Sequence, residues 1–131
     1  MFDSNKELNI IIPIPPRTKK NSLRIINVKG KPIIIPSELY KKYERECRPF
    51  IPKIYPPINY PINMKCIYYM PTRRKVDLNN LLEASTDMLV FYKVLEDDNS
   101  KIVVSHDGSR VFYDKENPRA EIYIKRVEEN V

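Results

Sequence analysis

The chain has 131 residues, of which 42% are hydrophobic and 31% charged, which is the balance of one folded globular domain. It contains only 2 Gly, 1 His and 2 Cys. Glycine-rich phosphate loops, histidine-rich metal sites and disulfide frameworks are therefore poor interpretations. No segment reads as a signal peptide or a membrane span, so we expect a protein of the reducing cytoplasm that has no membrane partner.

The net charge of +6 is distributed unevenly along the chain. Residues 1–75 hold 16 Lys and Arg against 5 Asp and Glu, whereas residues 76–131 hold 7 against 12. This division within one domain is compatible with a basic surface for a polyanion beside an acidic site for a divalent metal. The plainer alternative is a protein whose surface charge is simply uneven, and composition does not separate the two.

The elements predicted for the basic half are short and separated by prolines. In chain order they are a strand at 8–14, a hairpin turning at 27–30, a helix at 38–48, an extended connector at 49–61 and a strand at 62–70. Ser37 is the expected N-cap of the helix. Leu39, Tyr43 and Cys47 follow at four-residue spacing, which places them on one face.

The elements predicted for the acidic half begin with a helix. In chain order they are a helix from 78 to 92, an acidic loop at 94–100, two strands at 101–105 and 110–113, and a last strand at 120–127. Asp107-Gly108 between the middle strands is a strong hairpin signal. The whole order predicts an α+β domain with a mixed sheet and two main helices.

The segment from Arg73 to Asp77 places three cations directly before a carboxylate at the start of the second helix. Asn79, Glu83 and Asp87 then recur every four residues, which stacks them on one polar face of that helix. Such oxygen-bearing side chains are the ligands with which proteins hold Mg²⁺ for phosphate chemistry.

A second acidic pair, Asp97-Asp98, follows the helix. If the helix turns the chain back, this pair can converge with Asp77 at one end of the helix, and we state that convergence as an expectation. Each feature also has a plainer interpretation. Asp77 can be only an N-cap, the Asp97-Asp98 pair only a turn, and Glu83 and Asp87 only a solvated helix face. Their joint order in a basic protein favours a site.

On these motifs the chain resembles the RusA family of Holliday-junction resolvases, small endodeoxyribonucleases common in bacteriophages and prophages. The resemblance covers the whole chain and is most specific between Met70 and Val103. The matching motifs are Met70-Pro71, Arg73-Arg74-Lys75, Asp77-Leu78-Asn79-Asn80-Leu81, Asp87-Met88-Leu89 and Leu95-Glu96-Asp97-Asp98-Asn99-Ser100-Lys101-Ile102. The start, Ile12-Pro13-Ile14-Pro15-Pro16 followed by Asn21-Ser22, also resembles the opening of the family.

The resemblance implies a homodimer that binds branched DNA, namely the four-way junction, and cleaves it at paired sites in recombination and repair. It implies Mg²⁺ as the cofactor, with Mn²⁺ as a substitute. The implied catalytic positions are Asp77, Asn79, Glu83 and Asp98. The implied metal ligands are Asp77, Asp97 and Asp98, with Asn80 and Asp87 supporting them.

Two of these positions depart from the family pattern. Asn79 stands where the family has its second catalytic Asp, and Glu83 stands where it has a functional Lys. One hypothesis is that Glu83, one turn along, restores the carboxylate that Asn79 lacks. Another is that the protein binds junctions but cleaves them weakly or not at all. A third interpretation is a protein-interaction domain whose charge pattern is coincidental.

The candidate phosphate contacts come from the basic half. They are Lys19, Lys20, Arg24, Arg73, Arg74 and Lys75. Such cations supply affinity and positioning on DNA, with a strong dependence on salt. For each of them, a solvated surface charge is the plainer alternative.

Overall fold

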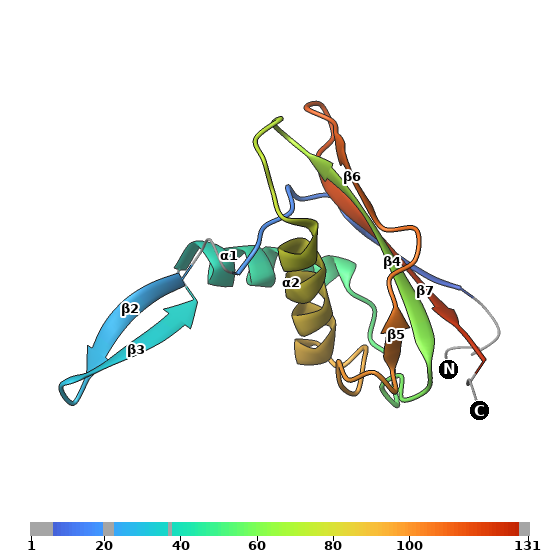
Figure 1. Ribbon diagram of the computed structural model, residues 1–131, viewed down its shortest axis with the longest axis horizontal. Coiled ribbons are helices and arrows are strands. Elements are labelled where there is room, and N and C mark those ends of the chain that lie inside the picture. Colours follow the sequence, from blue (N-terminus) through green and yellow to red (C-terminus); the bar gives the residue numbers. More distant parts are fainter. Residues whose placement is uncertain (1–6, 20–22, 37, 129–131) are drawn as a thin grey trace.

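A five-stranded mixed sheet is the centre of the fold (Figure 1). The computed structural model describes residues 7–19, 23–36 and 38–128. The sheet strands are β1 (Leu8–Ile12), β4 (Ile62–Met70), β5 (Val103–Ser105), β6 (Arg110–Tyr113) and β7 (Arg119–Arg126). Strand β7 pairs antiparallel with both β1 and β4, whereas β4 pairs in parallel with β5 and β6. The predicted α+β class and mixed sheet are confirmed.

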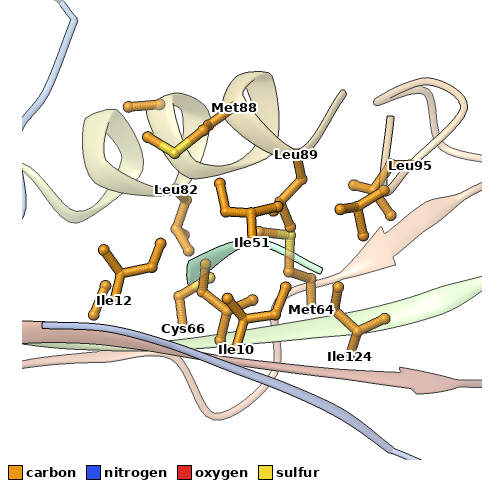
Figure 2. Close-up of a cluster of buried hydrophobic side chains, with 14 of the residues drawn as sticks. Ile10, Ile12, Ile51, Met64, Cys66, Leu82, Met88, Leu89, Leu95 and Ile124 are labelled. Carbon is orange, nitrogen blue, oxygen red and sulfur yellow. The ribbon is translucent and has the colours of Figure 1, made fainter. Parts of the chain in front are cut away.

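One face of the sheet carries the core. Burial alternates along β4 and β7, so that every second residue points toward the helices. Helix α2 (Leu78–Phe91) covers this face, and Figure 2 shows Leu82, Met88 and Leu89 above the strand residues Met64 and Cys66. The predicted apolar stripe of this helix is therefore confirmed. In the described ranges, no helix is long and apolar enough to cross a membrane.

Polar groups also fix α2 on the sheet. The buried hydroxyl of Tyr68 on β4 donates to the carbonyl of Leu81 at 3.0 Å and lies 2.7 Å from the hydroxyl of Ser85. The hydroxyl of Thr86 donates to the carbonyl of Leu82 at 2.8 Å. Buried hydroxyls are tolerated because each has a hydrogen-bond partner. The Thr86 bond lies within α2, whereas the two contacts of Tyr68 link the helix to β4.

Helix α1 (Glu38–Cys47) lies beside α2 and is followed by a short 3-10 turn, η2 (Arg48–Phe50). Its buried face is made by Tyr40, Tyr43 and Cys47, whereas the Leu39 side chain is 57% exposed. The prediction that Leu39 belongs to the buried face was wrong because the packed residues follow a spacing of three and then four. The expected N-cap, Ser37, lies outside the described residues.

A two-stranded arm, formed by β2 (Leu23–Val28) and β3 (Lys31–Pro36), projects away from the rest of the molecule (Figure 1). Lys29 and Gly30 form its turn, with φ values of 52° and 78°. Positive φ at both central residues is the geometry that matches the twist of a hairpin. The predicted hairpin is confirmed, and its strands form a sheet of their own.

The predicted hairpin around Asp107-Gly108 was wrong. Strands β5 and β6 do not pair with each other; both run parallel to β4 along the same edge. Between them the chain bulges, and the side chain of Asn63 holds the bulge by accepting from the Asp107 backbone N–H at 2.8 Å. Gly108 sits there with φ +88°, where an added Cβ would lie 2.8 Å from the Lys65 side chain.

Candidate nucleic-acid interface and acidic site

Asp77 begins helix α2. Its carboxylate accepts hydrogen bonds from the backbone N–H groups of Asn79 at 2.8 Å and Asn80 at 3.4 Å. The N-cap interpretation of Asp77 is thus confirmed. Both bonds end on the same oxygen, Oδ1, so capping does not occupy Oδ2. Asp77 is exposed, and its carboxylate can cap the helix and still face a ligand.

A groove of about 640 Å³ lies beside this helix start. One wall is the proline-led segment 15–18, and the other is the connection from the end of β4 into α2. Arg17, Arg74 and Lys75 supply three cations to its lining. In the sequence, Lys75 is separated from Asp77 by a single residue. The structure therefore places a cationic groove directly next to an exposed carboxylate.

The proline-led wall is anchored at two points. The backbone of Arg17 forms a hydrogen bond with the hydroxyl of Tyr43 on α1. Two residues on, the ammonium of Lys19 lies 3.4 Å from a carboxylate oxygen of Asp87 on α2. Burial raises the pKa of the Tyr43 hydroxyl, so the group stays protonated at neutral pH. This double anchoring fixes the wall against both helices.

The predicted phosphate contacts are in different situations. Arg74 and Lys75 line the groove, whereas the Arg73 guanidinium stacks over the Tyr113 ring at 4.2 Å. Lys19 pairs with Asp87, as described above. Lys20 lies outside the described residues, and of Arg24 the structure describes only the backbone, in β2. Contact with DNA stays a prediction for each of these cations.

Asp97 and Asp98 form an exposed acidic turn after α2. Asp97 accepts from the backbone N–H of Asp98 at 2.7 Å and from the side-chain amide of Asn99 at 3.2 Å. The hydrogen bond from the Asp98 backbone N–H, together with the one from the Asn99 side chain, lowers the pKa of the Asp97 carboxyl. The side-chain hydrogen bond with Asp97 raises the pKa of Asp98. The turn interpretation of this pair is confirmed, and it leaves the carboxylates open to solvent.

The expected convergence of Asp77 with Asp97 and Asp98 within one chain was wrong. The acidic turn lies at the C-terminal end of α2, where the Leu95 backbone N–H donates to the Leu89 carbonyl. The charge of Asp87 acts on Asp98 there. Ten residues of helix separate Asp87 from Asp77, which is about 15 Å of axis at 1.5 Å per residue. The loop after α2 turns toward the sheet and does not return to the helix start.

Asn79 and Glu83 are exposed on the face of α2 that starts at Asp77. Asn79 lies in the first turn and Glu83 in the next, as their four-residue spacing predicts. Asn80 is half-buried, and Asp87, farther along the helix, forms an ion pair with Lys19. The polar face predicted for this helix is present, while the role of Glu83 as a replacement carboxylate stays a prediction.

The acidic residues have the side-chain chemistry of a metal site. Carboxylate oxygens are the chemistry that Mg²⁺ prefers, and several must surround one ion. Among the residues that the structure describes, no three His, Cys, Asp or Glu side chains gather closely enough to hold a metal. One chain therefore supplies suitable ligands at two places but does not bring them together.

Sequence reasoning did not single out Arg17 as a contact. The residue was visible in the sequence as part of a basic stretch, but nothing local distinguished it from its neighbours. Its backbone lies against the Tyr43 hydroxyl, which is 26 positions away in the sequence. Proline before a cation, at Pro15-Pro16-Arg17, is the signal that could have indicated a fixed loop.

A cationic groove next to an exposed carboxylate, on a small α+β fold, is typical of proteins that bind a polyanion such as nucleic acid. The family model described as endodeoxyribonuclease RusA matches residues 13–125, so the chain belongs to the RusA family. It is therefore an endodeoxyribonuclease of the Holliday-junction resolvase class, which acts on branched DNA in recombination. Resolvases of this family generally depend on a divalent metal. No curated protein matches the chain.

Proposed function

We propose that the protein is a homodimeric, Mg²⁺-dependent resolvase that cuts four-way DNA junctions at paired sites during recombination and repair in the cytoplasm. The observation that carries this proposal is the exposed carboxylate of Asp77, which directly follows the segment that lines the groove with Arg74 and Lys75. Cations in such a groove hold a phosphate backbone, and an adjacent carboxylate is then close to a phosphodiester bond. Mn²⁺ is expected to substitute for Mg²⁺.

The distance between the two acidic places supports a site shared by two copies. Asp77 and the Asp97–Asp98 turn lie at opposite ends of α2, and one chain gathers no three-acid cluster in its described part. If two copies associate with their α2 helices antiparallel, the start of each helix comes to the end of the other. Two equivalent acidic sites then form, related by the two-fold axis.

The arm supports association of two copies. Ile25 and Ile34 face each other across the hairpin and are 70% and 65% exposed, and Val28 and Ile33 are also exposed. A two-stranded hairpin is marginally stable alone, and apolar side chains on both of its faces indicate that a protein surface covers it. Ile25→Ser with Ile34→Ser should therefore lower the mass seen by sedimentation equilibrium, whereas Val104→Ser on β5 should not.

A mixing experiment tests the shared site. Asp77→Asn and Asp98→Asn should each lower cleavage of a labelled four-way junction by at least about 100-fold, as expected for loss of a metal ligand. Asn is as good an N-cap as Asp, so Asp77→Asn should fold normally. Co-refolding the two variants should restore nicking, because one of the two sites in the mixed dimer then has both carboxylates.

The controls separate the parts of the proposal. Sites contained within one chain would give no restoration, because each site in the mixed dimer would carry one defect. Asp107→Asn, in the exposed bulge beside β4, should leave cleavage unchanged. Terbium luminescence supplies a readout that does not depend on activity: metal binding should be weaker in each single variant and partly recovered in the mixture.

A second candidate function is junction binding with weak or lost cleavage. The observation that favours it is Asn79, which brings no negative charge to the first turn of α2. Incubation of the unaltered protein with a labelled four-way junction, with and without Mg²⁺, separates the two functions. Rapid Mg²⁺-dependent nicking would end the binding-only alternative, whereas tight binding without nicking would support it.

A further inference from the structure

The groove beside Asp77 has two kinds of lining. Its cations are Arg17, Arg74 and Lys75, and its other side chains include the apolar groups of Pro16, Met70 and Val76. Arg17, Arg74 and Lys75 are exposed, whereas Pro16 is buried and Met70 and Val76 are half-buried. The charged groups are therefore the more exposed part of the lining, whereas Met70 and Val76 also pack against the hydrophobic core and leave only part of their surface to form an apolar floor. A volume of about 640 Å³ falls within the range of small-ligand sites.

A paired duplex does not explain this lining. A duplex presents sugars and phosphates to a groove of this size, and its bases stay stacked inside the helix. Phosphates account for the cations but gain nothing from an apolar floor. A nucleotide that has left the stack carries both chemistries, because its phosphate is anionic and its base has apolar faces that stack on protein side chains.

The walls of the groove are also fixed before any ligand binds. The proline-led wall contacts α1 where the Arg17 backbone meets the Tyr43 hydroxyl, and it contacts α2 through the partly exposed Lys19–Asp87 ion pair. On the opposite side, Met70 ends β4 and is paired with Tyr113 of β6. A preformed site loses little conformational entropy on binding, which favours recognition of one nucleotide over general attraction to DNA.

We propose that this groove receives a single unpaired nucleotide of branched DNA, with its phosphate on Arg17, Arg74 and Lys75 and its base over Pro16, Met70 and Val76. The inference rests on the proposed function, because it concerns the strand whose backbone passes Asp77. It adds a bound base to the proposed interface, which contacts to phosphate alone do not require. The protein thereby recognises a branch by an unstacked base as well as by the course of the backbone.

A fluorescent base tests this inference directly. The probe is a DNA duplex with 2-aminopurine as a one-nucleotide bulge, compared with the same duplex with 2-aminopurine fully paired, in the presence of the unaltered full-length protein. The bulged duplex should bind about tenfold more tightly, and its fluorescence should change on binding. Equal affinity for the two duplexes would overturn the inference.

Two substitutions should distinguish the contribution of the apolar floor from that of the groove cations. Val76→Thr keeps the side-chain shape but places a hydroxyl in the floor, so it should remove most of the preference for the bulge while leaving affinity for the paired duplex. Arg74→Ala should weaken binding to both duplexes and keep their ratio. Val104→Thr on β5 and Arg45→Ala on α1, both exposed, are the matched controls and should change neither.

The outcomes also separate this inference from the proposed function. Cleavage of a four-way junction without any preference for the bulge would overturn the inference and leave the resolvase proposal standing. An unchanged preference in Val76→Thr would likewise overturn the assignment of the floor. Failure to bind any of the DNAs would overturn both proposals.

Discussion

The two ends of helix α2 differ in how they hold their acidic groups. At the first end a single carboxylate, Asp77, caps the helix beside a cationic groove. At the last end Asp97 and Asp98 bond to their own turn. The sharp change of charge between Lys75 and Asp77 in the sequence therefore falls where the groove-lining segment meets the start of α2.

Beyond the proposed metal ligands, the largest effect expected at the first end concerns Glu83. If this carboxylate replaces the charge that Asn79 lacks, Glu83→Gln should lower the rate of junction cleavage by about tenfold, which is the size of effect seen when a group near a metal ligand is lost. Adding Asn79→Asp to Glu83→Gln should recover the rate. Single-turnover cleavage at saturating protein measures both.

Glu116→Gln, in an exposed loop, is the matched control and should cleave normally. An unchanged rate in Glu83→Gln would show that the helix start works without a second carboxylate on this face. Asp77 would then be the carboxylate at the start of α2 on which cleavage depends.

A smaller effect should distinguish the cations at the two ends. Arg74 lines the groove, whereas the charge of Lys19 is largely balanced by Asp87 at 3.4 Å. Arg74→Ala should weaken junction binding about fivefold and reduce the slope of log affinity against log salt by about 1. Lys19→Ala should change both quantities less. A gel shift over a series of salt concentrations measures them, and equal losses would contradict the comparison.

The smallest effect expected concerns the hydroxyl of Tyr68, which links β4 to the first half of α2. Tyr68→Phe removes the hydroxyl that contacts Ser85 and the Leu81 carbonyl, leaving buried polar groups without a partner. The free energy of unfolding should fall by about 1 kcal/mol. Urea denaturation followed by circular dichroism measures it. Tyr55→Phe, whose ring is 88% exposed, should show no change, and equal losses in both would argue against this link.

Periodicity was a good guide to the elements themselves. The apolar stripe of α2 is continuous over four turns, and the strands around Ile10, Met64 and Ile122 alternate cleanly, so local pattern and final packing agree. The pattern was misleading for Leu39, because two tyrosines of the same helix compete with it for the core. Large aromatic side chains bury more surface than a leucine does.

The errors about the site have one physical origin, which is contact between distant parts of the chain. Asp107-Gly108 has the composition of a hairpin turn, but the Asn63 side chain 44 positions earlier holds it as a bulge. Asp98 was expected near Asp77 because the chain can turn back after a helix. Hydrogen bonds to the connector before β4, such as the one that the Glu96 N–H donates to the Ile58 carbonyl, keep it at the far end instead.

The arm carries a consequence for the protein in the cell. Its two strands are adjacent in the sequence and can pair within microseconds, well before a second copy is met by diffusion. During that interval two unpaired strand edges and a set of exposed isoleucines are available to any other unfolded or half-folded chain. A solitary copy is thus an aggregation hazard, so the proposed dimer would protect solubility as well as bring the two acidic places together.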